Sequence, residues 1–154
     1  MTIVELQDLV FRELSELFKD YCLRAEDCHT TTAIKVYKQD LPIPETDDDS
    51  PEMPPFIIVR LSDGEQPEWD GEHSVNMAVI ICVWDDASER QGARDVMSII
   101  TRIHQRVMKH PALGGMFKPP FKWTLNDEDT YPYYYGACQF TVTASAVRRE
   151  NPLA

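Results

Sequence analysis

The most apolar stretch of the chain, VNMAVIICVW at residues 75–84, predicts a long β-strand in the middle of a sheet. One face of this strand would carry Val75, Met77, Val79, Ile81 and Val83, and the other Ala78, Ile80, Cys82 and Trp84. A strand that is apolar on both faces has to be covered on both. A helix that covers one face is easy to find in the sequence, whereas a cover for the other is not. The mismatch indicates a partner subunit.

Apolar residues at spacings of three and four predict two long amphipathic helices. The first begins at Thr2, which forms a capping box with Glu5, and continues to about Arg24. The second extends from about Ala87 to Lys109, which corresponds to about 35 Å at 1.5 Å per residue. A strand of about ten residues spans roughly 33 Å, so this helix can lie along the sheet.

Four further segments have strand patterns: residues 32–38 at a sheet edge, 56–61, 121–125 and 135–147. The last of these alternates between a core row with Phe140 and Val142 and a hydroxyl-rich row with Thr141 and Thr143. Residues 62–72 contain two Asp-Gly pairs, which predict a hairpin turn that leads into the central strand.

The elements follow one another as helix, three strands, helix and two strands, which predicts an α+β fold. We expect one mostly antiparallel sheet of about five strands with two long helices packed on one face. The whole chain, residues 1–154, is predicted to form a single domain. It carries a hairpin tip at 62–72 and a mobile loop at 41–55, where proline and aspartate are frequent and no periodicity is present.

The formal net charge is −11, and nearly all of it lies between residues 40 and 72, which contain eleven acids and one base. The chain lacks the basic patch that binds nucleic acid, so sequence-specific DNA binding is not expected. Concentrated negative charge suits a surface that repels DNA or docks on a basic protein. We interpret Cys82 and Cys138 as reduced core thiols of a cytosolic protein. No apolar run reaches the ~18 residues of a membrane span.

The sequence contains no phosphate-binding glycine loop, no Gly-x-Ser-x-Gly elbow and no His-Glu-x-x-His motif. We therefore expect no enzyme activity, no metal and no cofactor. Cys22, Cys28 and His29 do not have the spacing of a zinc site. The alternative function is that of a small metal-dependent hydrolase. Its acidic ligands would be Asp47–Asp49 or the cluster of Asp63, Glu65 and Asp70.

Three pieces of the sequence together suggest a family. These are Pro-Phe-Ile-Ile-Val-Arg-Leu at 55–61, the long strand that ends in Val83-Trp84, and the helix end His-Pro-Ala-Leu at 110–113. With an Asp-rich turn and a Thr/Val-rich last strand, this order resembles the tail terminator proteins of long, non-contractile-tailed phages of the lambda type. The Pro/Asp-rich insert at 41–55 departs from the family pattern and leaves the role of that loop open.

The resemblance implies a structural virion protein of the phage tail or neck, present in the host cytoplasm during assembly. Such proteins form a homohexameric ring on the tail tube, end its polymerisation and present the surface for head–tail joining. The implied partners are further copies of the chain, the tail tube protein and the head-tail connector or neck protein. DNA passes through the ring without sequence recognition, and no membrane is involved. Another neck or tail-completion protein is the alternative within this class.

We expect the loop 41–55 and the hairpin 62–72 to project from the body and meet the lumen of the ring, the tube or the neck. Aromatic side chains in acidic turns are the candidate contact anchors. For Trp69 two interpretations stay open: the ring folds back on its own hairpin, or it anchors another chain. The candidate interface residues are Trp69, Asp63, Glu65, Asp70, Glu72, Tyr131, Tyr133, Tyr134, Tyr135, Thr141 and Thr143.

Overall fold

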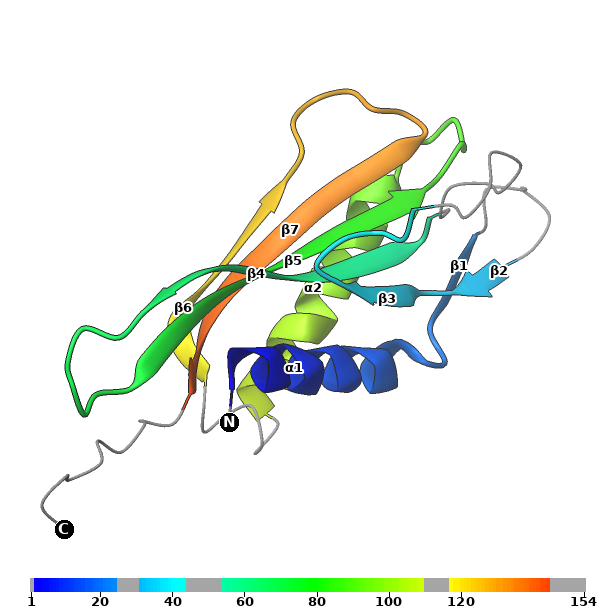
Figure 1. The fold of residues 1–154 in the computed structure, drawn as a ribbon. Coiled ribbons are helices and arrows are strands. Elements are labelled where there is room, and N and C mark those ends of the chain that lie inside the picture. Colours follow the sequence, from blue (N-terminus) through cyan, green and yellow to red (C-terminus); the bar gives the residue numbers. More distant parts are fainter. Residues whose placement is uncertain (1, 25–30, 44–53, 110–116, 145–154) are drawn as a thin grey trace, which may run out of the picture.

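The computed structural model describes residues 2–24, 31–43, 54–109 and 117–144. Its elements are α1 (Ile3–Phe18), β1 (Cys22–Arg24), β2 (Thr31–Ala33), β3 (Lys35–Lys38), β4 (Phe56–Glu65), β5 (His73–Trp84), α2 (Gly92–Lys109), β6 (Phe117–Leu125) and β7 (Tyr133–Ala144). Five strands form one sheet in the order β3-β4-β5-β7-β6, and β1 and β2 form a separate pair (Figure 1). Only β3 and β4 are parallel neighbours in the large sheet. The predicted α+β fold with a mostly antiparallel sheet is confirmed.

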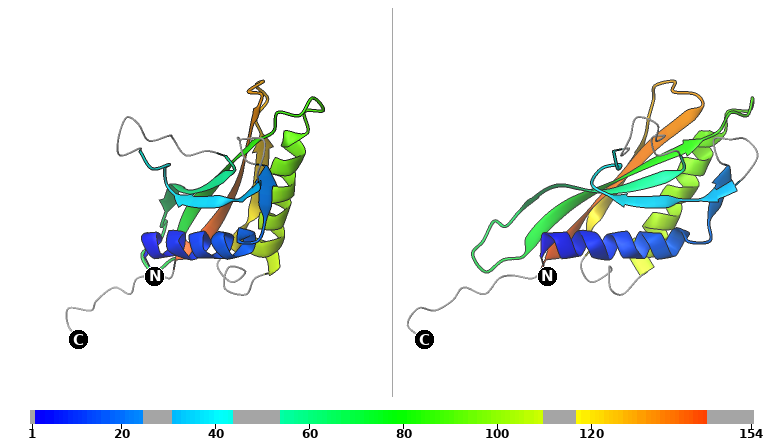
Figure 2. Two further views of the ribbon diagram at one scale, coloured as in Figure 1. Left: turned by 90° about the vertical axis from the view of Figure 1, so that its right-hand side faces the viewer. Right: turned by 45° about the vertical axis from the view of Figure 1, so that its right-hand side comes forward.

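The central strand β5 pairs with β7 over its full length and with β4 over most of it. Its row from Val75 to Val83 is buried in the main core, together with the apolar faces of both helices. α1 lies against β3 and β4, and α2 lies against β5, β6 and β7, so the two helices divide one face of the sheet between them (Figure 2). The interhelical pair of Arg106 Nη2 and Glu13 Oε2, at 3.0 Å, joins them.

α1 begins as predicted but ends earlier. The Thr2 hydroxyl accepts a hydrogen bond from the Glu5 amide, and the Glu5 carboxylate accepts one from the Thr2 amide, which completes the capping box. The predicted continuation to about Arg24 is wrong, because the helix stops at Phe18 and Cys22–Arg24 forms a strand. Tyr21 still packs edge-on against the Phe18 ring, so its apolar spacing reflects burial outside the helix.

α2 begins at Gly92, five residues after the predicted start at Ala87. The Ala87 amide donates to the Asp85 carboxylate, and the chain then turns through Arg90, whose φ is +53°. Gly92 lies directly under the ring of Tyr134, where an added Cβ would be 2.1 Å from a ring carbon. The first residue of α2 can lie this close to Tyr134 of β7 only because it has no side chain.

Two strands are longer than predicted. β4 continues to Glu65, which pairs with Ser74, and the ladder passes through an irregularity between Leu61 and Asp63. The turn is therefore residues 66–72, which we call the hairpin tip. β6 begins at Phe117 rather than at residue 121, and its register shifts between Lys118 and Lys122. Residues 44–53 of the predicted loop, and the predicted strand end after Ala144, lie outside the described residues.

Candidate functional site

The sheet face opposite the two helices is the candidate interaction surface, and we call it the outer face. One cross-strand row contains a residue from every strand, in the order Tyr37, Ile58, Ile80, Ala137 and Thr124. In the described part of the chain, no helix lies over this row (Figure 2). The row is apolar at every position except its last. The pattern that predicted an apolar second face on the central strand is thus present in the fold.

Part of the outer face is closed by the chain itself. Phe56, Ile58 and Cys82 are buried there in a small second cluster. The partly buried side chains that cover it are Tyr37, Leu41, Ile80 and Tyr133. The sequence therefore overstated how much of the second face lacks a cover. What remains open is the strip beside this cluster, over β5, β7 and β6.

Tyr135 borders the open strip, and 38% of its surface is exposed. It pairs across the strands with Cys82. Partial burial raises the pKa of the Tyr135 phenol, and the neighbouring Cys82 thiol raises it further. The phenol is therefore neutral at physiological pH. It offers an aromatic ring with one hydroxyl group, and tyrosine is enriched at protein interfaces for this reason.

The half of the outer face nearer the hairpin is polar. Asn76 donates to the Asp63 carboxylate at 2.8 Å, and its amide oxygen accepts from the Thr141 hydroxyl at 2.6 Å. Glu72 forms an ion pair with Lys118 on the edge strand. These bonds join β4, β5, β6 and β7 at one end of the sheet. The base of the hairpin is thus held by Asp63, Glu72 and Thr141. Their polar groups already form hydrogen bonds or ion pairs with residues of neighbouring segments.

The hairpin tip projects beyond the sheet as an ordered turn (Figure 1). Its backbone carbonyls at Glu68 and Trp69 both accept from the Gln66 side chain at 3.1 Å, and the Gly71 amide donates to Glu68. Trp69 is 75% exposed, which makes it one of the most exposed large apolar side chains described. Glu65, Glu68 and Asp70 are close to it in the sequence. A rigid, acidic turn with an exposed indole is the form of a contact anchor.

The tyrosine-rich turn lies at the other end of the sheet. The Tyr131 hydroxyl donates to the Asp86 carbonyl at 2.5 Å, and the Arg90 guanidinium lies over its ring, 5.1 Å from the centroid. Arg90 also pairs with Asp129, whose pKa is lowered by the backbone amide of Tyr131 and then by this arginine. Tyr131 is nevertheless 45% exposed.

The structure separates the candidate interface residues into two groups. Twelve residues of β5 lie between the hairpin end and the tyrosine turn, which is roughly 36 Å at about 3.3 Å per residue. Tyr134 does not face outward, because its ring packs against Gly92 and is partly buried against the main core. Thr143 is 8% exposed. These two residues belong to the packed interior, and a single surface cannot contain the rest.

Sequence reasoning missed two surface features. Trp123 on the edge strand β6 is 55% exposed. A groove also runs along α2, between Tyr21 on one side and Leu125 on the other. Neither has a local signal, since both depend on which distant segments lie beside the helix and the edge strand.

The acidic residues considered for a hydrolase are not gathered into a site in the described ranges. No group of three His, Cys, Asp or Glu side chains there has the geometry to hold a metal ion. Asp47–Asp49, Cys28 and His29 lie outside those ranges. No helix in the described part of the chain is long and apolar enough to cross a membrane.

Comparison with known proteins does not assign the chain to a family. No family model and no curated protein matches it.

Proposed function

We propose that the chain is a structural subunit that assembles with further copies of itself into a ring, in the manner of a phage tail terminator. Such a ring would cap the tail tube, end its polymerisation and present the head-attachment surface. The supporting observation is the open strip of the outer face, where Ile80 and Ala137 lie in a row that no helix covers within residues 2–24, 31–43, 54–109 and 117–144.

The open strip supports assembly because burial of apolar surface is the main favourable term in protein association. Both described helices pack on the opposite face of the sheet, and another copy that covered the strip would bury its apolar residues. In a closed ring every subunit supplies one contact surface and covers another. The acid-rich hairpin supports the second half of the proposal, because a lumen that DNA crosses must repel phosphate rather than bind it.

Negative-stain microscopy of the purified chain, together with sedimentation velocity over a range of concentrations, tests the proposal. The expected result is closed rings in equilibrium with monomers, with the ring fraction rising with concentration. A chain that stays monomeric up to its solubility limit, both alone and with tail tubes, would refute it. Position in an intact particle then distinguishes a terminator from another neck or tail-completion protein.

A matched pair of variants tests whether the outer face is the assembly surface. Ile80→Glu places a charge in the open strip, whereas Val4→Glu places one on α1, where Val4 is 62% exposed. We expect Ile80→Glu to reduce ring formation at least tenfold and Val4→Glu to leave it unchanged. Equal ring formation by the two variants would remove the outer face from the interface. Circular dichroism of both variants confirms that the fold is retained.

Trp69→Ala is the corresponding test of the hairpin tip. Because the indole is 75% exposed, its removal should leave the monomer folded while weakening ring or tail assembly. Unchanged assembly would show that the indole is not an anchor.

A further inference from the structure

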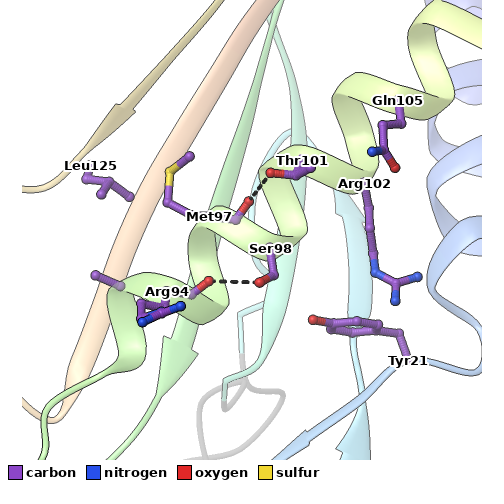
Figure 3. Close-up of a pocket in the computed structure, with 9 residues that line it drawn as sticks. Tyr21, Arg94, Met97, Ser98, Thr101, Arg102, Gln105 and Leu125 are labelled. Carbon is purple, nitrogen blue, oxygen red and sulfur yellow. Dashed lines mark hydrogen bonds between the residues drawn. The ribbon is translucent and has the colours of Figure 1, made fainter.

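The groove on α2 has a composition unlike the rest of this acidic protein. It has a volume of about 750 Å³ and contains no carboxylate among its lining residues (Figure 3). Tyr21 and Arg102 form one wall, Met97 and Leu125 the other, and Ser98 and Thr101 lie between them. A docking surface of this kind offers apolar contact and positive charge together.

The floor of the groove is smooth because its hydroxyl groups are turned back onto the helix. Ser98 donates to the Arg94 carbonyl at 3.0 Å, and Thr101 donates to the Met97 carbonyl at 2.8 Å. These side chains therefore need no polar partner from outside. A flat or aromatic group can lie over them without leaving an unsatisfied hydrogen bond.

The positive charge of the groove is not neutralised within the described part of the chain. Arg102 lies over the Tyr21 ring, 4.5 Å from its centroid, and has no ion pair there. Arg94, at the rim of the groove, has none either. By contrast, Arg106, one turn beyond Arg102, is paired with Glu13. The two guanidinium groups of the groove are therefore available to an anionic partner.

The hairpin tip has the complementary composition. Glu68 and Asp70, which flank the exposed Trp69 in the sequence, and Glu65 at the end of β4 have no ion pair among the residues that the structure describes. The tip and the N-terminal half of α2 lie at opposite ends of the molecule, so a tip cannot reach the groove of its own chain (Figures 1 and 2).

We propose that the groove on α2 binds the hairpin tip of a second copy of this chain. The Trp69 ring lies over the floor beside Met97, and the acids of the tip pair with Arg94 and Arg102. Since tip and groove are different surfaces, the contact is head-to-tail and repeats from copy to copy, as a ring requires. This inference rests on the ring proposed above and adds a second contact between neighbouring copies to that of the outer face.

Charge reversal with complementation tests the contact. One variant carries Arg94→Glu and Arg102→Glu, and a second carries Glu68→Lys and Asp70→Lys. Each variant alone presents like charges at every contact, so we expect association at least tenfold weaker than that of the natural chain. An equimolar mixture restores opposite charges at each contact when the two variants alternate, and we expect it to recover the oligomers.

The control variant carries Arg12→Glu and Lys19→Glu on α1, which change the net charge as much as the groove variant does. Sedimentation velocity of all five samples, namely the natural chain, the two reversed variants, their mixture and the control, at about 0.05 and 0.5 M salt, gives the association constants. Charge pairing predicts that the natural chain associates more weakly at the higher salt. Circular dichroism shows whether each variant is folded.

The outcomes separate this inference from the ring itself. Oligomers of the natural chain, lost in both reversed variants and regained on mixing, support the tip-to-groove contact. If the natural chain forms oligomers and the groove variant matches the control, the contact is wrong and the ring stands. Loss in the tip variant alone means that the tip binds another surface. If the natural chain does not associate at any concentration, either alone or with tail tubes, both proposals fail.

Discussion

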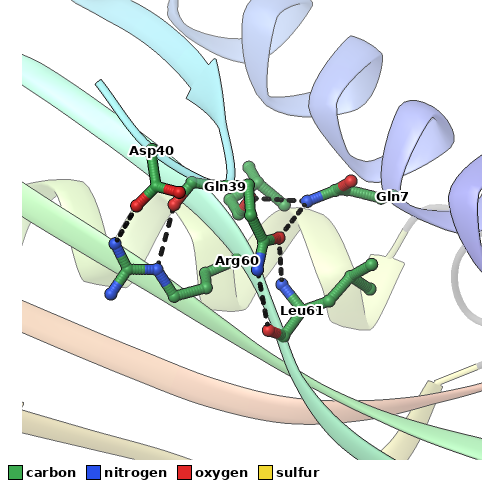
Figure 4. A network of polar contacts seen from close by, with 6 residues as sticks. Gln7, Gln39, Asp40, Arg60 and Leu61 are labelled. Atoms are coloured by element: carbon green, nitrogen blue, oxygen red, sulfur yellow. Dashed lines mark hydrogen bonds and ion pairs between the residues drawn. The ribbon is translucent and has the colours of Figure 1, made fainter. Parts of the chain in front are cut away.

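Gln39 follows the edge strand β3 and continues its hydrogen bonding to β4 through its side chain. Its substitution is therefore a direct test of the fold. Gln39 has a φ of +70°, and its amide donates to the Val59 carbonyl at 2.9 Å. Its side-chain oxygen accepts from the Leu61 amide at 3.0 Å, and its side-chain nitrogen donates to the Leu61 carbonyl at 3.2 Å (Figure 4). The side chain thus pairs with β4 as a further strand residue would. Gln7 of α1 donates to the same oxygen at 2.8 Å.

Two substitutions separate the hydrogen bonds from the backbone conformation. Gln39→Ala removes three side-chain hydrogen bonds, of which the two to Leu61 are exposed, so we expect a loss of about 1–2 kcal/mol. Gln39→Gly removes the same bonds but relieves the left-handed backbone, which costs an ordinary residue about 1–2 kcal/mol. Glycine also loses more conformational entropy on folding, which reduces this gain in stability by about 0.5–1 kcal/mol. Glycine should therefore be more stable than alanine at residue 39 by about 0.5–1 kcal/mol.

Urea denaturation followed by circular dichroism measures both differences. Ser98 on α2 provides the control, because a helical position reverses the order and makes glycine about 1 kcal/mol less stable than alanine. If alanine equals or exceeds glycine at residue 39, the assignment of strain to that backbone is refuted. If Gln39→Ala is as stable as the natural chain, the side-chain pairing with Leu61 contributes nothing.

Two further outcomes follow from close packing and burial. Gly92→Ala should displace the Tyr134 ring and lower stability by about 1–3 kcal/mol in thermal unfolding, and combining it with Tyr134→Ala should cost less than the sum of the two. Burial raises the pKa of the Cys138 thiol to about 12, from 9.0, so in a Cys28→Ser background Cys22 should be alkylated rapidly at pH 8 and Cys138 only on unfolding. Because the unfolded thiol ionises first, stability should fall above pH 9.0, and Cys138→Ala should reduce that fall.

The alternation of apolar residues predicted the strands well because it records burial, which the sheet imposes directly. The β5 row from Val75 to Val83 is buried in the main core, as its spacing required. Helix ends were predicted less well. Tyr21 continues the apolar spacing of α1 after the helix has ended, since it packs on the core from a different backbone conformation. Spacing alone does not distinguish these two cases.

The start of β6 differs from the prediction for a related reason. The strand predicted at 121–125 begins at Phe117, so Pro119 and Pro120 lie within the edge strand at the point where its register shifts. Proline removes a ladder donor, which an edge strand tolerates and a central strand does not. Whether a strand lies at an edge depends on the order of the sheet. That order is set by contacts between β6 and β7 rather than by the segment itself.

The candidate surfaces were predictable only in part. Trp69 and its acids were identified from their own turn, because a hairpin exposes its tip whatever the rest of the chain does. The turn residues around Tyr134 predict a surface position. Its ring instead packs against Gly92, a residue of α2 that is distant in the sequence. The groove could not be predicted, because Tyr21 and Leu125 become its walls through packing on either side of α2.

The arginines of the groove, unpaired in the described part of the chain, stand out against the charge of the whole chain. The chain has 26 acids and 15 bases, so each base has many carboxylates available to it. Several bases are paired in the described ranges, including Lys38 with Asp8 and Arg60 with Asp40. Arg94 and Arg102 have no ion pair in those ranges. The overall negative field of an acidic protein repels anions, so an anion can approach only where local positive charge offsets that field. Under the proposed contact, an acidic tip from another copy would meet two arginines and no carboxylate among the residues that line the groove.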